Sequence, residues 1–164
     1  TIYEGRPDGM NPYKEEIARL TNKRKEKGSL SQVIKGKDIF IGLSSPGLVT
    51  ADMVKSMNKK PIVFALANPV PEIWPKDALE AGVAIAVDGR TINNALAFPG
   101  IMRGALDVGV PTIDYAMKFA AAEMLASLAG KNDVVPNFMN MSVHEKVAEA
   151  VKQVASKRLN GSGI

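Results

Sequence analysis

Three polar loops, each placed directly after an apolar run, contain the side chains that could bind a small ligand. Ser44-Ser45-Pro46-Gly47 follows the first run, Asn68 ends the second, and the segment 88–94 follows the third and ends in Asn93-Asn94. Hydroxyls, backbone amides and carboxamides of this kind bind a phosphate, a ribose, a carboxylate or an amide by hydrogen bonds. The chemistry that these residues support is recognition and orientation of a ligand.

Each loop also has a purely structural interpretation. A Ser-Ser-Pro-Gly sequence is typical of a tight turn before a helix, Asn68 of a turn at a strand end, and Asn93-Asn94 of loop capping. The sequence contains no paired carboxylates at metal-binding spacing, no nucleophile elbow and no G-x-G-x-x-G motif. The spacing of the residues therefore predicts a ligand-binding edge without catalytic groups.

The single histidine and the methionine-rich segment are assigned to structure. His144 lies in the sequence Ser142-Val143-His144-Glu145, which has the pattern of a capping box at a helix start, so the ring is expected to be exposed and to have no catalytic role. Methionines within 117–124 recur at helical spacing. Such methionines are typical of a core or a subunit contact.

The elements that must position the three loops are buried strands joined by short helices. Apolar runs at 38–43, 61–67 and 83–87 do not alternate with polar residues, which is typical of strands covered on both faces. They start roughly 22 residues apart, a spacing that suits parallel strands with helical crossovers. The sequence thus predicts an α/β fold with a doubly wound parallel sheet, in which right-handed crossovers place the three loops at one edge.

Helix starts are marked by capping residues and prolines. Asn11-Pro12, Ser29, Thr50 and Pro75 precede or begin the helices of the first part of the chain. Three more helices are expected after the last strand, beginning at Pro99, at Thr112 (to about Ala129) and at Ser142. The sheet is therefore expected to be followed by carboxyl-terminal helices.

Composition indicates a globular protein and excludes several function classes. Of the 164 residues, 46% are apolar and 23% charged, and no apolar run approaches the roughly 18–20 residues that cross a bilayer. The net charge of +4 comes from short basic clusters, 23–27 and 59–60, without interleaved aromatic residues, so no nucleic-acid partner and no membrane association are expected. The absence of cysteine fits a cytoplasmic protein.

Three segments together resemble the malic enzymes of prokaryotic type, and the match covers nearly the whole chain. They are Ile39–Gly47, Pro61–Pro69, and Asn93–Gly100 with the following Arg103-Gly104-Ala105-Leu106. Asn-Pro and Asn-Asn-x-x-x-Phe-Pro-Gly, in this order, are specific in combination. The resemblance implies a Rossmann-like domain that ends near residue 110, so that 1–110 is the carboxyl-terminal portion of a dinucleotide-binding domain and 111–164 a helical segment packed on it.

The resemblance implies oxidative decarboxylation of L-malate to pyruvate and CO₂ with NAD or NADP and a divalent Mg or Mn ion. By position in the motifs, Asn68 and Asn94, with Asn93 as neighbour, correspond to the asparagines that contact malate and the nicotinamide. Ser44, Ser45, Pro46 and Gly47 correspond to the loop that packs on the cofactor. A homodimer or higher homo-oligomer is expected by analogy with the family.

The same resemblance implies that the family's catalytic Tyr and Lys, its acidic metal ligands and its Gly-rich loop lie upstream of Thr1. We therefore expect the chain to be part of a longer enzyme, whose upstream half is its partner. We expect it to be inactive and poorly soluble alone, because a strand that should pair beside 39–43 would be absent. Two alternatives stay open: another NAD(P)-dependent dehydrogenase of the amino-acid type, and a non-catalytic nucleotide-binding module.

Overall fold

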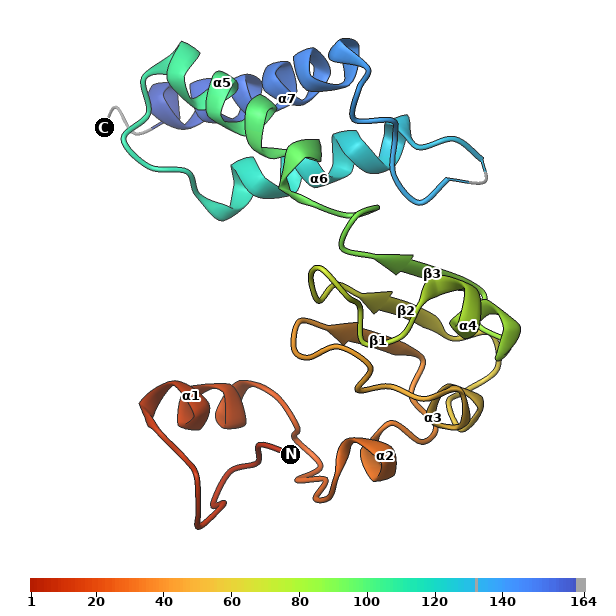
Figure 1. Ribbon diagram of the computed structural model, residues 1–164. Helices are drawn as coiled ribbons and strands as arrows, with labels where there is room; N and C mark the ends of the chain where they lie inside the picture. Colours follow the sequence, from red (N-terminus) through yellow and green to blue (C-terminus); the bar gives the residue numbers. More distant parts are fainter. Residues whose placement is uncertain (132, 162–164) are drawn as a thin grey trace. The chain divides into compact units, whose positions relative to one another are not determined.

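A three-stranded parallel sheet organises the first part of the chain, and a group of helices forms the second (Figure 1). The computed structural model describes residues 1–131 and 133–161. Contacts divide the chain into two compact units, Thr1–Arg90 and Thr91–Ile164. Helix α5 therefore groups with the helices after it, whereas the sequence predicted a domain boundary near residue 110, and that family-based boundary stays a prediction.

The first unit alternates strands with short helices. Its elements are α1 (Pro12–Leu20), α2 (Leu30–Val33), β1 (Ile39–Gly42), α3 (Ala51–Lys55), β2 (Ile62–Ala65), α4 (Pro75–Glu80) and β3 (Ile85–Asp88). The strands are parallel and lie in the order β1-β2-β3, with Ile39 opposite Ile62 and Ile62 opposite Ile85. The α/β parallel sheet predicted from the sequence is confirmed.

The core of this unit lies on one face of the sheet. Val63 and Ala65 of β2 are each 1% exposed and pack with side chains from the short helices and their ends, among them Ile34, Val54 and Ala78. Side chains of a strand alternate between faces. Ile39, Ile41 and Ile85, which belong to the opposite face, are 55%, 59% and 37% exposed. In the described residues β1 pairs only with β2, so it is an edge strand.

Local capping explains where the first helices begin. The Asn11 side chain accepts a hydrogen bond from the Lys14 amide at 2.9 Å, and Thr50 accepts one from Met53 at 3.3 Å. Ser29 forms a capping box with Gln32. These starts agree with the sequence, in which each capping residue directly precedes its helix.

The second unit consists of η1 (Asn94–Leu96), α5 (Phe98–Val108), α6 (Tyr115–Leu128) and α7 (Met141–Gly161). Two of its predicted starts were wrong. Helix α6 is capped by Asp114, whose Oδ1 accepts from the Met117 amide at 2.9 Å, and not by Thr112. Ser142 lies inside α7, where its amide and hydroxyl donate to Oδ1 of Asn140, so the capping box expected at Ser142 is not what starts the helix.

Two glycines bring α5 and α7 close together. A Cβ at Gly100 would lie 2.6 Å from Cγ1 of Val147, and a Cβ at Gly104 would lie 2.5 Å from the carbonyl oxygen of Ala148. Val147 and Val151 are fully buried at this crossing. Gly100 and Gly104 thus form a notch on α5 into which Val147 and Val151 of α7 pack. The Asn93-Asn94 segment precedes α5 in the chain.

Candidate functional site

The carboxyl ends of the three strands meet at one edge of the sheet of the first unit. Gly42, Ala65 and Asp88 end their strands at the same register position, because the strands are parallel and paired in line. Ser44–Gly47 and Asn68 follow the first two strands and are exposed. In parallel sheets this edge is where ligands bind. The structure therefore brings these two predicted segments to one sheet edge.

Glu72 connects the two loops and was not predicted from the sequence. It is fully buried, at 0% exposed. Its Oε1 accepts hydrogen bonds from the Ser44 amide at 2.7 Å and from the Ser44 hydroxyl at 3.4 Å, and its Oε2 accepts one from the Ala67 amide at 3.1 Å. Burial acts to raise the pKa of Glu72, but these donors and the backbone amide of Glu72 itself outweigh it, so the pKa lies below its ordinary value.

Two glycines leave room for the side chains at this edge. A Cβ at Gly42 would lie 2.5 Å from Cδ and 2.6 and 2.8 Å from the two carboxylate oxygens of Glu72. A Cβ at Gly89 would lie 2.5 Å from Nδ2 of Asn68. Because backbone at these two positions approaches a side chain so closely, only glycine fits there without displacement.

The loop Ser44–Gly47 uses part of its backbone internally. The Ser44 amide donates to Glu72, and the Gly47 amide donates to the carbonyl of Pro71 at 3.1 Å. The expectation that the amides of this loop face a phosphate is therefore wrong for these two. The exposed hydroxyl of Ser45 and the ring of Pro46 are the parts of the loop that can lie against a bound ligand.

Asn68 is turned outward at the end of β2. It is exposed, the peptide bond that joins it to Pro69 is cis, and its Nδ2 donates to the carbonyl of Leu66 at 3.4 Å. At 3.4 Å this hydrogen bond is long and therefore weak. The position fits a ligand-contacting side chain held by the loop around it.

Asp88 and Arg90 form a second charged group at this edge that the sequence did not single out as a pair. Asp88 is 8% exposed, and its carboxylate accepts from the Arg90 amide at 3.1 Å and lies 3.4 Å from Nε of Arg90. The guanidinium also lies over the Trp74 ring, 5.0 Å from its centre. A buried carboxylate is stabilised by such a pairing, so this arrangement fixes the end of β3.

In the second unit the two neighbouring asparagines differ in what they do. Oδ1 of Asn93 accepts from the Ala95 amide at 2.8 Å and caps η1. Asn94 is exposed and lines a surface pocket of about 440 Å³ together with Phe98, Ile101 and Lys118. The pocket is mainly apolar with a carboxamide and an ammonium group in its lining. Of the pair, Asn94 is thus the one that lines the pocket.

His144 is half-buried, whereas the sequence led us to expect an exposed ring. Its Nε2 lies 2.7 Å from the carbonyl oxygen of Phe138, and within the described residues its buried Nδ1 has no hydrogen-bond partner. The bond to Phe138 ties the start of α7 to the loop before it. The expectation for the methionines holds, since Met117 is 1% exposed in a core with Ala121 and Val151.

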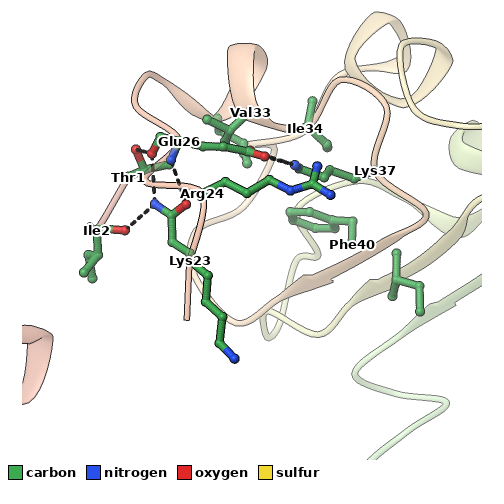
Figure 2. Close-up of a pocket in the computed structure, with 12 residues that line it drawn as sticks. Thr1, Ile2, Lys23, Arg24, Glu26, Val33, Ile34, Lys37 and Phe40 are labelled. Carbon is green, nitrogen blue, oxygen red and sulfur yellow. Dashed lines mark hydrogen bonds and ion pairs between the residues drawn. The ribbon is translucent and has the colours of Figure 1, made fainter. Parts of the chain in front are cut away.

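Another hollow of the first unit lies by the amino-terminal end of β1 (Figure 2). It measures about 580 Å³ and is lined by apolar residues such as Ile34 and Phe40 and by charged ones such as Arg24. Its wall is built on Glu26, which pairs with Lys37 at 2.7 Å and whose pKa is lowered first of all by the hydrogen bond from Lys37. None of the predicted site residues lines this hollow.

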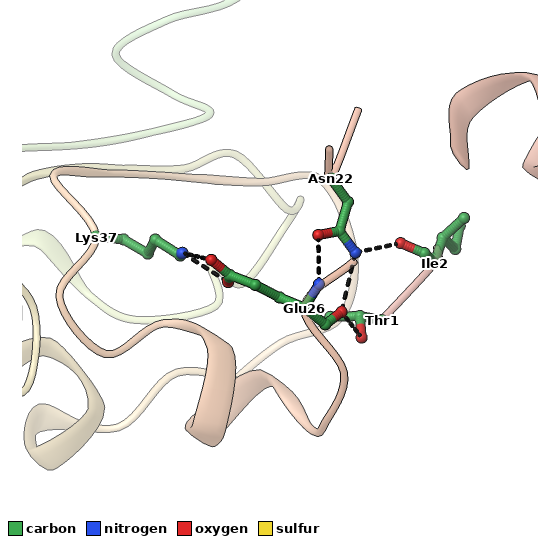
Figure 3. A network of polar contacts seen from close by, with 5 residues as sticks. All are labelled: Thr1, Ile2, Asn22, Glu26 and Lys37. Atoms are coloured by element: carbon green, nitrogen blue, oxygen red, sulfur yellow. Dashed lines mark hydrogen bonds and ion pairs between the residues drawn. The ribbon is translucent and has the colours of Figure 1, made fainter. Parts of the chain in front are cut away.

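Asn22 organises the chain beside that hollow (Figure 3). Its φ of 46° is in the left-handed region, which asparagine tolerates. Its side chain donates to the carbonyls of Ile2 and Glu26, each at 2.9 Å, and accepts from the Glu26 amide at 2.8 Å. The hydroxyl of Thr1 donates to the same Glu26 carbonyl at 3.0 Å. Two of these four hydrogen bonds, from Asn22 to Ile2 and from Thr1 to Glu26, hold the first residues against the loop that precedes α2.

Two general properties bear on the class of site. In the described residues no group of three or more His, Cys, Asp or Glu side chains could hold a metal ion. No helix in 1–131 or 133–161 is long and apolar enough to cross a membrane.

Comparison with known proteins identifies the relatives of the chain. No protein-family model matches it. It is 47% identical to a bifunctional malic/malolactic enzyme of Bacillus subtilis over 99% of its own length, and 46% identical to an NAD-dependent malic enzyme of Geobacillus stearothermophilus over 88%. An NADP-dependent malic enzyme of Rhizobium meliloti is 51% identical over 81% of the chain. The chain spans 41%, 32% and 18% of the lengths of these relatives.

Solved structures agree with these relatives. An NAD-dependent malic enzyme from Thermotoga maritima is 40% identical and superposes with a TM-score of 0.86 over 92% of this chain and 42% of its own. The malic enzyme of Entamoeba histolytica is 36% identical, with a TM-score of 0.85 over 96% of this chain and 35% of its own. Sequence and fold therefore agree over almost all of the chain: it belongs among the malic enzymes, as a portion of one.

Proposed function

We propose that this chain is part of an enzyme that oxidises and decarboxylates L-malate to pyruvate and CO₂ while it reduces NAD or NADP. The observation that carries the proposal is the 47% identity to a malic/malolactic enzyme across 99% of the chain. Both NAD-dependent and NADP-dependent enzymes occur among the relatives, so the choice of cofactor is part of the assay. A cytoplasmic location, in keeping with the absence of cysteine, and a homo-oligomer are included in the proposal.

In this proposal the residues of the chain bind and orient. Asn68 hydrogen-bonds to malate or the nicotinamide amide from the end of β2, and Asn94 does so from the exposed start of η1. Ser45 and Pro46, exposed in the loop after β1, lie against the cofactor, with Ser44 and Gly47 fixing the shape of that loop. Asn93 supports Asn94 by capping η1. A bound dinucleotide would supply the hydride acceptor for the oxidation of malate.

The divalent metal enters the proposal through the family alone. The described residues offer no cluster that fits Mg²⁺ or Mn²⁺, so no step of the reaction is derived from a metal ligand of this chain. The alternatives of an amino-acid dehydrogenase and a non-catalytic module differ from this proposal in which substrate, if any, is turned over.

The test is to incubate the full-length protein with L-malate, Mg²⁺ or Mn²⁺, and either NAD or NADP. We expect reduced dinucleotide and pyruvate in equal amounts. Reduction with an amino acid in place of malate would favour the dehydrogenase alternative. Binding of the dinucleotide without turnover of either substrate would favour the non-catalytic module.

The role of Asn94 is tested in the same protein. Asn94→Ala removes a hydrogen bond to a charged or strongly polar ligand, so kcat/KM for malate should fall by about tenfold or more without loss of helical structure. Asn58→Ala is the matched control, since Asn58 is exposed in the loop before β2, at the end of that strand opposite to Asn68. Equal kinetics for the Asn94 variant and the control would refute the assignment.

A further inference from the structure

The Glu72 carboxylate lies where the hydrogen-bond ladder between β1 and β2 ends. The last ladder contact between β1 and β2 at this end is the bond from the Leu66 amide to the Gly42 carbonyl, at 2.9 Å. Beyond it the Ser44 and Ala67 amides donate to Glu72, and the Ala67 amide does so in a buried environment. Glu72 supplies an acceptor for both, one with each carboxylate oxygen.

The backbone of the same segment repeats the connection. The carbonyl of Pro71 accepts from Gly47 at 3.1 Å, and the carbonyl of Glu72 accepts from Val49 at 3.0 Å. The segment 71–72 therefore binds the chain after β1 at three positions, Ser44, Gly47 and Val49. Only the side chain of Glu72, however, reaches both loops at once, because its two oxygens have different partners.

The chain reserves space for an ionised group at this point. Gly42 has no side chain, and any Cβ there would lie within 2.8 Å of both carboxylate oxygens. A buried charge without partners is strongly unfavourable, so the three donors on Glu72 and the lowered pKa are mutually consistent. Since the carboxylate is 0% exposed and both oxygens are engaged, it is unsuited to exchange protons with a substrate.

We propose that Glu72 is a positioning residue: its ionised carboxylate fixes the loop Ser44–Gly47 relative to Asn68, the two segments that present ligand-binding groups at this sheet edge. Ala67 is the residue before Asn68, so the bond from its amide to Glu72 fixes the Leu66–Ala67 peptide, directly ahead of the residue that carries the Asn68 side chain. The inference rests on the proposed function for its effect on malate and dinucleotide, and on hydrogen bonds alone for the clamp itself.

The first test is Glu72→Gln in the full-length protein. Glutamine keeps the size of the side chain but turns one of the two acceptor oxygens into an NH₂ donor, which then faces the donor amide of Ser44 or of Ala67. We expect amide hydrogen exchange at one of these two residues to accelerate by about tenfold or more, because a charge-assisted bond is lost. Exchange at buried Val151 in the second unit should not change.

The kinetic readout accompanies the exchange measurement. We expect kcat/KM for malate to fall by about tenfold or more through loss of orientation. Glu72→Asp, which keeps the charge but is one methylene shorter, should recover part of this loss. Glu80→Gln is the matched control: Glu80 is exposed on nearby α4, in a 3.9 Å ion pair with Lys76, and its replacement should leave exchange and kinetics unchanged.

Gly42→Ala provides a second variant if Glu72→Gln folds poorly. It displaces the carboxylate sterically without changing its charge, and the same amides should lose protection. Unchanged exchange at both Ser44 and Ala67 in folded variants overturns the clamp. Faster exchange with kinetics equal to the control overturns the positioning role. If the wild-type protein does not oxidise malate, the proposed function fails, and the exchange of these two amides still decides whether the clamp exists.

Discussion

At the notch on α5, a Gly→Ala substitution should destabilise the protein, whereas in most helices it stabilises. In an exposed helix, Gly→Ala stabilises by about 1 kcal/mol because alanine has the higher helix propensity. At Gly104 the added Cβ would lie 2.5 Å from the Ala148 carbonyl oxygen and 2.9 and 3.0 Å from two carbons of Val151. Overpacking of this kind destabilises by about 1–3 kcal/mol. Gly104→Ala should therefore lower the free energy of unfolding by about 1 kcal/mol.

The assay is urea unfolding followed by the helical circular dichroism signal. The calibrating variant is Ala122→Gly at an exposed position of α6, which measures the propensity difference without a steric term and should destabilise by about 1 kcal/mol. Trp74, the single tryptophan, lies in the first unit and reports on it separately by fluorescence.

A second substitution tests the cause. Val151→Ala in the Gly104→Ala background removes the Cγ1 contact at 3.0 Å but leaves the carbonyl of Ala148, so the two substitutions should be coupled by about 0.5 kcal/mol or more. An increase in stability for Gly104→Ala alone would refute the close approach of the two helices at this position.

Three further predictions concern a cap, a titration and a surface. Asp114→Ala should destabilise α6 by about 1 kcal/mol in thermal unfolding because the bond to Met117 is lost, whereas Thr112→Ala should change little. Burial raises the pKa of Glu72, but its hydrogen-bond donors lower it by more. The ionised carboxylate therefore stabilises the fold at pH values above its ordinary pKa of 4.5, and this stabilisation is lost as the pH falls through the lowered pKa. Glu72→Gln should therefore make the free energy of unfolding depend less on pH on the acid side. Ile41→Lys, at a 59% exposed position of the edge strand β1, should reduce self-association in sedimentation experiments. Unchanged sedimentation would contradict the idea that chains associate through this strand.

Much of the first unit could be predicted because its signals are local. The three apolar runs are each bounded by turn residues, and their near-equal spacing allows only short crossovers, so the parallel direction of the strands follows. Asn11, Ser29 and Thr50 each precede a helix as predicted, although Ser31 and Asp52, two further good capping residues, stand two positions after the second and third of them. Where two good caps stand close together, as at Thr112 and Asp114, packing decides between them, and the sequence does not contain that information.

The site was less accessible to sequence reasoning. A glutamate after Pro-Val-Pro has the composition of an exposed loop, and nothing in the spacing indicates that Glu72 turns back to the ends of two strands. A signal was nevertheless present in Gly42, because a glycine inside an apolar strand often marks a close approach by another group. The difference between Asn93 and Asn94 was also hidden, since it depends on which of the two caps the short helix η1.

The contact of Gly100 and Gly104 with the valines of α7 has a consequence for how related sequences can change. A larger residue at position 100 or 104 is accommodated only if position 147 or 151 becomes smaller, so these positions should covary among homologues although neither helix needs to touch a ligand. Asn94 lies six residues before Gly100, and a shift of α5 moves it as well. Substitutions in α7 could therefore be selected for their effect on an asparagine that they never contact.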